Sequence, residues 1–183
     1  MKAALVVLLF AASAWAQNPV AAAVAACGPE GVEFKVKLDD AAHAPGQPEA
    51  GKALVYFIHE AGSEAILVYP TVKLGVDGAW IGANHGNSYF AVSMTPGERH
   101  LCATLQSSLV EQRVELAHFT AEAGKTYYFR TRLVLSRSVE LLDLEPIDHD
   151  QGVYLAATSS LSVSRATKEA RLPKQYGGHI DTR

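Results

Sequence analysis

Histidine and cysteine are the residue types in this chain that are best suited to hold a metal ion. His100 and Cys102 stand two positions apart in an alternating segment, so both side chains point to one face of a strand, a spacing that can chelate copper or zinc. Two features weigh against a metal: Cys102 has Cys27 available as a disulfide partner, and the spacing fixes no third ligand. We therefore expect no metal site, with a metal-binding module around His100 and His118 as an alternative.

The motifs that would indicate nucleotide binding or hydrolysis are incomplete. Gly46 to Ala53 matches the spacing of a phosphate-binding loop until Ala53, which replaces the Ser or Thr that would hold magnesium, and the segment leads into a strand. His59-Glu60 begins like the helix of a zinc protease, but Ser63 takes the place of the second histidine, so we expect a surface loop there. No Gly-x-Ser-x-Gly motif is present. The sequence therefore predicts no catalytic residue and no cofactor, and a hydrolase acting on envelope material is the rival hypothesis.

Three aromatic residues, Trp80, Tyr89 and Tyr128, are the candidates for a binding surface. In the run Tyr127 to Phe129 the side chains alternate across a sheet, so at least one ring points outward. A row of exposed rings could stack on a sugar or on a partner protein. Packing in the core is the role that we expect first for the same rings, with the binding surface as the alternative.

The elements that must position these residues are short strands, recognised by apolar residues at every second position. Asp77-Gly78 favours a hairpin turn and Asp148 favours a helix N-terminus. The sequence predicts an all-β fold, an antiparallel β-sandwich of about seven to nine strands of the immunoglobulin-like or transthyretin-like kind, with a short helix over Asp148 to Ala157. Strand patterns include Val32 to Leu38, Ala53 to His59, Ile66 to Tyr69, Val72 to Val76, Ser88 to Met94, Arg99 to Leu105, Arg113 to Thr120, Thr126 to Leu135 and Val139 to Leu144.

The ends of the chain differ in composition from its middle. Met1 to Ala16 has a lysine, an apolar run and a final Ala-Trp-Ala, which predicts a cleaved secretory leader. Residues 17–31 are expected to be mobile, residues 32–158 to form the sandwich, and residues 159–183 to form a polar basic tail without stable structure. No cysteine directly follows the apolar run, so the protein is not expected to be a lipoprotein.

Export changes how the two cysteines are interpreted, because thiols outside the cytoplasm are usually oxidised. We predict a disulfide between Cys27 and Cys102, with two free thiols or a buried Cys102 that merely packs as the alternatives. Removal of the leader takes away Lys2 and leaves 15 basic against 19 acidic residues, a net charge of −4 that argues against a nucleic-acid partner. From Ser159 onward five basic residues accompany two acidic ones, which favours contact of the tail with anionic lipid or cell-wall polymer.

Four short motifs follow one another in the middle of the chain: Val76-Asp77-Gly78, Tyr89 to Val92, Pro96 to His100, and Ala123 to Phe129. Their order resembles the bacterial family called domain of unknown function 2846 (DUF2846), over roughly Lys52 to Thr158. The first half is also similar to PEGA-type envelope modules, which share the Asp-Gly hairpin and the Pro-Gly turn. The resemblance implies an envelope or secreted β domain with no established activity, so it transfers no catalytic residue.

Together these observations predict an exported protein of the periplasm or the extracellular space. We expect an envelope-associated module that binds or scaffolds without catalysis, and whose partner is an envelope protein or polymer of unknown identity.

Overall fold

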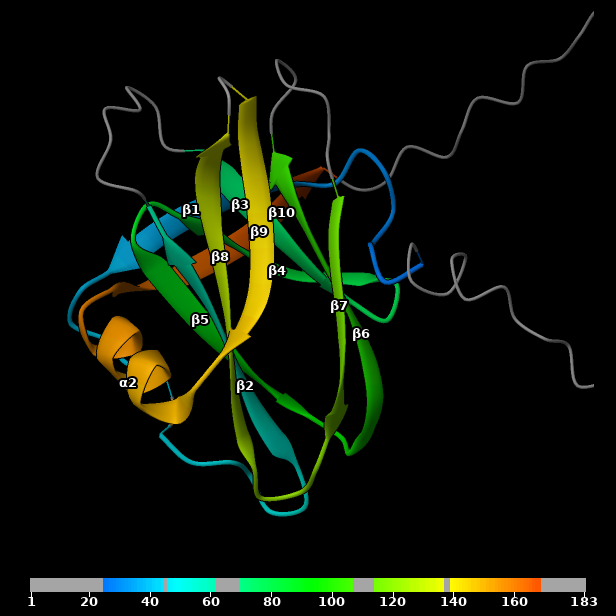
Figure 1. Ribbon diagram of the computed structural model, residues 1–183, viewed down its shortest axis with the longest axis vertical. Helices are drawn as coiled ribbons and strands as arrows, with labels where there is room; N and C mark the ends of the chain where they lie inside the picture. Colours follow the sequence, from blue (N-terminus) through cyan, green and yellow to red (C-terminus); the bar gives the residue numbers. More distant parts are fainter. Residues whose placement is uncertain (1–24, 45, 62–69, 107–113, 137–138, 169–183) are drawn as a thin grey trace, which may run out of the picture.

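Two β-sheets packed face to face and one short helix make up the part of the chain that the computed structural model describes, residues 25–44, 46–61, 70–106, 114–136 and 139–168 (Figure 1). The six-stranded sheet has the order β1-β10-β5-β2-β8-β9, and the four-stranded sheet has the order β4-β3-β6-β7. The first contains β1 (Glu33–Asp39), β10 (Ser160–Lys168), β5 (Ser88–Met94), β2 (Ala53–Glu60), β8 (Thr126–Ser136) and β9 (Val139–Ile147). The second contains β4 (Ala79–His85), β3 (Thr71–Val76), β6 (Gly97–Gln106) and β7 (Val114–Ala121). The predicted all-β sandwich is therefore confirmed.

Strand number and direction differ from the prediction. The described residues form ten strands, and two neighbouring pairs in the six-stranded sheet are parallel, β2 with β8 and β10 with β5. Parallel neighbours need a long crossover, and here β3, β4, β6 and β7 of the other sheet lie in the chain between β2 and β8. The strand expected at Ile66 to Tyr69 lies outside the described residues.

The expectation of an unstructured tail from Ser159 is wrong for its first part. Ser160–Lys168 is strand β10, which pairs with β1 on one side and with β5 on the other. Ser162 is buried and donates its hydroxyl to the Ala83 carbonyl (2.6 Å), and Ser164 accepts from the Ala83 N–H (3.1 Å). These serines bond to the backbone of β4, and Leu161 packs against the apolar cluster around Tyr89, so a largely polar segment joins the sandwich. The rest of the tail, 169–183, lies outside the described residues.

Residues 25–31, just before β1, lie on the outer face of the four-stranded sheet. They were expected to be mobile, but several contacts hold them there. Cys27 and Cys102 form the predicted disulfide, with their Cα atoms 5.1 Å apart. Ala26 is buried, and its carbonyl accepts from the Gly78 N–H at 3.2 Å. A Cβ atom on Gly75 would lie 2.8 Å from the Ala26 carbonyl oxygen, so the close approach requires glycine.

A central strand of the six-stranded sheet, β2, is buried on both faces. Its inner face meets the other sheet in a core where Phe57 stacks on Phe90 and Phe129, with ring centroids 5.4 and 6.0 Å apart. Its outer face is covered by helix α2 (His149–Ala157), which lies against β2 and β8 (Figure 1). The N-cap of the helix is Asp148, as predicted, since its carboxylate accepts from the Gln151 N–H at 2.9 Å.

Helix α2 approaches the sheet closely because of one glycine. A Cβ atom on Gly152 would lie 2.2 Å from the Cγ atom of Tyr128, so only glycine lets the helix lie against this ring. Among the described residues, no helix is long and apolar enough to cross a membrane.

Candidate functional site

The three aromatic residues predicted to form a binding surface do not form one. Tyr89 and Tyr128 are 3% and 7% exposed and lie on either side of Tyr56, with ring centroids 5.9 and 4.9 Å from it. Trp80 lies on the other sheet, where its indole N–H donates to the Pro29 carbonyl at 2.8 Å and its ring lies 4.4 Å from the Lys73 ammonium. Packing against the rest of the protein is therefore the role that the structure supports: helix α2 lies against Tyr128, the Ala44 N–H donates to the Tyr89 hydroxyl, and the segment before β1 covers part of Trp80.

His100 and His118 do come together, as cross-strand partners of β6 and β7 with ring centroids 6.3 Å apart. Glu98 is the nearest carboxylate, 4.0 Å from His100 Nε2. Within the described ranges, no three histidine, cysteine, aspartate or glutamate side chains gather in a geometry that could hold a metal ion. The metal-binding alternative therefore rests on two histidines, since Cys102 is bonded to Cys27.

His59 occupies a different environment from the surface loop expected of it. It is the seventh residue of β2, is 1% exposed, and places Nδ1 3.1 Å from the Thr131 carbonyl oxygen. Burial lowers its pKa from 6.5 to about 4, so the ring is neutral at physiological pH. Its cross-strand partners are Ser88 of β5 and Thr131 of β8, which are buried as well, so His59 lies among polar residues in the interior of the sandwich.

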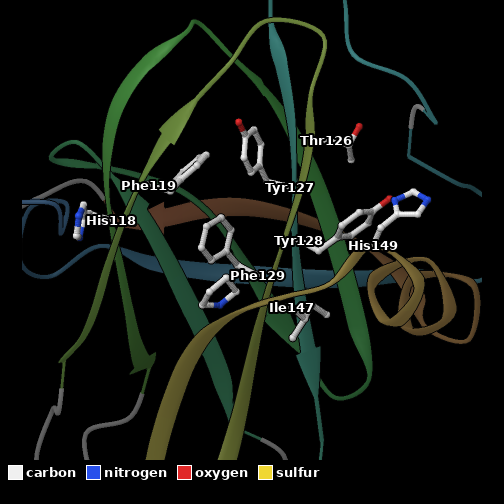
Figure 2. A pocket seen from close by; sticks show the side chains of 9 residues that line it. His118, Phe119, Thr126, Tyr127, Tyr128, Phe129, Ile147 and His149 are labelled. Atoms are coloured by element: carbon white, nitrogen blue, oxygen red, sulfur yellow. The ribbon is translucent and has the colours of Figure 1, made fainter.

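A small cavity of about 190 Å³ lies near the start of β8 (Figure 2). Phe119 contacts Tyr127 and Phe129 there, with both pairs of ring centroids 4.9 Å apart. Figure 2 shows His118 and His149 on opposite sides of this aromatic group. The two imidazoles therefore do not converge on one reacting atom, and the cavity is an aromatic gap at the side of the sandwich.

A larger hollow, which we call the α2 groove, lies between the carboxyl end of helix α2 and the ends of β2 and β8. Its volume is about 640 Å³, within the range of roughly 300 to 1,000 Å³ typical of small-molecule sites. Its walls come from four parts of the chain that are distant in sequence. The lining residues are Ile58, Glu60, Ala61, Asn87, Arg132, Leu133, Tyr154, Leu155, Thr158 and Ser159.

One wall of the α2 groove adjoins a ladder of charged side chains on three adjacent strands. In the register of β2, β8 and β9, Glu60 is aligned with Arg132, and Arg132 with Asp143. Two residues earlier in β8, on the same face of the strand, Arg130 is aligned with Glu145. Since side chains alternate along a strand, these residues share the outer face of the sheet with the apolar patch beneath helix α2.

The ion pairs of this ladder hold the groove residues in fixed orientations. The Arg130 guanidinium is 12% exposed and bonds to both Glu60 (Nη1 to Oε2, 3.1 Å) and Glu145 (Nε to Oε1, 3.1 Å). Arg132 donates from Nε to Asp143 at 3.3 Å and places Nη2 3.5 Å from Glu145. The hydrogen bond from Arg130 lowers the pKa of the Glu145 carboxyl, which is therefore ionised at neutral pH.

The opposite wall provides an amide and an aromatic ring. Asn87 lies in the turn between β4 and β5, and its side-chain oxygen accepts from the Ala61 N–H at 2.8 Å. Tyr154, on helix α2, is 67% exposed. The helix ends beside it, where Thr158 caps the carbonyls of Tyr154 and Leu155 with its hydroxyl (2.9 and 3.3 Å). The α2 groove thus combines an exposed ring with a carboxylate, a guanidinium and an amide group. Each of these three polar groups is also bonded to another residue of the protein.

Sequence reasoning missed the α2 groove although part of the signal was present. Arg130 and Arg132 stand two positions apart in β8, and Asp143 and Glu145 stand two positions apart in β9. Each pair therefore lies on one face of its strand, and the two pairs can interact across the strands. The parallel pairing of β2 with β8 places Glu60 beside these residues. That pairing depends on the crossover through the other sheet, which no local sequence pattern indicates.

The chain was compared with known proteins. A family model described as "Protein of unknown function (DUF2846)" matches residues 49–142. Comparison with curated proteins and with solved structures gives no match.

Proposed function

Since the chain belongs to the DUF2846 family, whose function is unknown, we propose from its own geometry that it is a non-catalytic binding module with the α2 groove as its binding site. The observation that carries the proposal is the set of polar side chains around this groove, each held by a partner on a rigid strand or turn. Groups that are already oriented lose little conformational entropy when a ligand binds.

The electrostatics of the groove favour binding over catalysis. A general acid or base works best when its pKa lies near the operating pH. The Glu145 carboxyl has a lowered pKa, and Glu60 and Arg132 are engaged in ion pairs. His59, whose pKa is about 4, points into the core. These ion pairs engage the charged groups in and beside the groove, which supports a binding role.

We also propose that the module is exported and acts at the cell envelope. The Met1 to Ala16 leader and the Cys27–Cys102 disulfide support this, because disulfides persist in oxidising compartments. Contact of the tail with anionic lipid or polymer stays part of the proposal: Arg165 and Lys168 belong to strand β10, and Arg165 is exposed there.

Retention on isolated cell-envelope fragments tests the binding role. The mature chain, beginning at Gln17, is mixed with washed fragments and sedimented, and Tyr154→Ala is compared with the wild type. Val153→Ala is the matched control, because Val153 is the neighbouring residue on the same helix and is also exposed (46%). We expect the wild type and the control to sediment and the Tyr154 variant to stay in solution. Equal behaviour of all three proteins would contradict the α2 groove as the binding site.

A further inference from the structure

We propose that the ligand of the α2 groove is a neutral, hydroxyl-rich molecule, namely a segment of a saccharide chain. This inference rests on the proposed binding function and assigns its ligand class. It follows from the charge balance of the groove, from the kinds of hydrogen-bonding groups on its walls, and from the exposed ring at its rim.

The charge balance disfavours an anionic ligand. The ladder beside the groove has three carboxylates (Glu60, Asp143, Glu145) and two guanidiniums (Arg130, Arg132), and each guanidinium already bonds to two carboxylates. A phosphate or carboxylate would have to displace one of these partners while it lies close to the others. Like charges that approach this closely repel each other strongly.

A cationic ligand meets the opposite obstacle. The carboxylates that would attract it are each engaged by an arginine, and the Arg132 side chain, 41% exposed, lines the groove itself. An ammonium group entering the groove would approach a guanidinium that cannot lose its charge. Of the ladder residues only Glu60 and Arg132 line the groove itself, and their opposite charges cancel at the place where a ligand would sit.

The hydrogen-bonding groups of the groove match those of hydroxyls. A hydroxyl donates one hydrogen bond and accepts others, so it can bridge a carboxylate oxygen and an N–H donor. Glu60 uses Oε2 for Arg130 and has Oε1 as a second acceptor. Arg132 uses two of its three nitrogens for Asp143 and Glu145. Asn87 uses its oxygen for the Ala61 N–H, so its NH2 group is the end that remains to donate.

The exposed ring of Tyr154 completes the match. An aromatic ring presents an apolar face with a polar edge, and the C–H face of a pyranose ring can pack on it while the hydroxyls point to polar groups. Tyr154 lines the groove together with Glu60, Asn87 and Arg132, so a saccharide segment that fills the groove would meet both the ring and the polar groups. A purely apolar ligand would remove water from the remaining hydrogen-bonding positions of these three groups without replacing it, which is costly.

Titration with defined oligosaccharides tests the assignment. The mature chain, labelled with ¹⁵N, is titrated with chitotetraose, cellotetraose, maltotetraose and mannotetraose as neutral probes, and with tetragalacturonate and tetralysine as charged probes. We expect at least one neutral probe to shift the amide signals of Asn87, Arg132 and Tyr154. Tyr154→Ala should weaken that binding about tenfold, whereas the control Val153→Ala should change it by less than about twofold.

A second variant separates ligand contact from structural damage. Asn87→Asp keeps the oxygen that accepts from the Ala61 N–H and replaces the NH2 donor with a second carboxylate oxygen. Its unfolding temperature should match that of the wild type, and it should bind the neutral oligosaccharide more weakly. Unchanged affinity in this variant and in Tyr154→Ala would overturn the placement of the sugar in the α2 groove.

The remaining outcomes distinguish the ligand class from the binding role. If only a charged probe shifts the groove signals, the saccharide assignment is wrong and the binding site is retained. If none of the six probes shifts them, the assignment is overturned, and retention on envelope fragments then decides whether the binding function survives. Loss of that retention in Tyr154→Ala alone would uphold the function with another ligand.

Discussion

Mild acid should destabilise this fold through one buried histidine, His59. Its ring is 1% exposed, and Nδ1 lies 3.1 Å from the Thr131 carbonyl oxygen, so the neutral ring carries its proton on Nδ1 and donates it there. The second nitrogen, Nε2, is buried and has no hydrogen-bond partner among the described residues. A second proton would therefore create a buried charge whose N–H has no acceptor, and desolvation lowers the pKa to about 4.

The size and direction of the effect follow from this shift. The unfolded chain takes up the proton near pH 6.5, whereas the folded chain resists it until about pH 4. Stability is thus fully present above pH 6.5 and falls as the pH decreases through this interval. The full loss is about 3 kcal/mol, since one pKa unit corresponds to ~1.4 kcal/mol, and about 2 kcal/mol of it should appear between pH 7 and pH 5.

Urea unfolding at pH 7 and pH 5 measures this loss. In His59→Asn the amide NH2 can still donate to the Thr131 carbonyl but does not titrate. This variant should be less stable at pH 7, because its smaller side chain leaves a cavity, yet it should lose about 2 kcal/mol less than the wild type on going to pH 5. His118→Asn, which changes an exposed histidine of β7, is the control and should follow the wild type. Equal losses in the wild type and in His59→Asn would refute the reasoning.

Three further changes test the covering of the two outer sheet faces. Gly152→Ala should lower the free energy of unfolding by about 1 to 3 kcal/mol, because the new Cβ would lie 2.2 Å from a ring carbon of Tyr128. Gly46→Ala, with open space around it, should leave the free energy of unfolding nearly unchanged, and urea titration of both variants measures the difference. Replacing Cys27 and Cys102 together by alanine should lower the free energy of unfolding by about 4 kcal/mol, because the cross-link spans 75 residues. An unchanged unfolding midpoint would contradict a stabilising role for this disulfide. Asp148→Ala should cost about 1 kcal/mol by removing the helix N-cap, and equal thermal unfolding of variant and wild type would show that the cap contributes nothing.

Local patterns in the sequence were sufficient for the elements that depend on neighbouring residues. The apolar run Ser88–Met94 predicts its strand to the residue, and Asp148 marks the start of helix α2. Both depend on interactions within a few residues, such as the pleat of a strand or a carboxylate that caps the next turn. The Cys27–Cys102 pair was also accessible, because two cysteines allow a single intrachain disulfide.

Burial could not be read from the same patterns. In β2 both alternating sets of side chains are apolar, because one face meets the other sheet and the other face meets helix α2. The period of two shows that a strand has two faces, but it does not show what covers each face. For this reason the pattern left both the surface and the core open for Tyr89 and Tyr128, and it assigned His59 to a surface loop.

The candidate site depended on contacts between distant parts of the chain. Glu60, Asn87, Arg132 and Tyr154 come from a strand end, a turn, another strand and a helix, and they meet only because β2 and β8 pair in parallel after a crossover through the other sheet. Serine hydroxyls that bond to the backbone of β4 likewise bring the polar segment Ser160–Lys168 into the sandwich. The sequence by itself determined the strands, the helix start and the disulfide, because these follow from local geometry or from the number of cysteines. Only the tertiary structure decided which faces are covered and which polar groups meet, because those depend on long-range pairing.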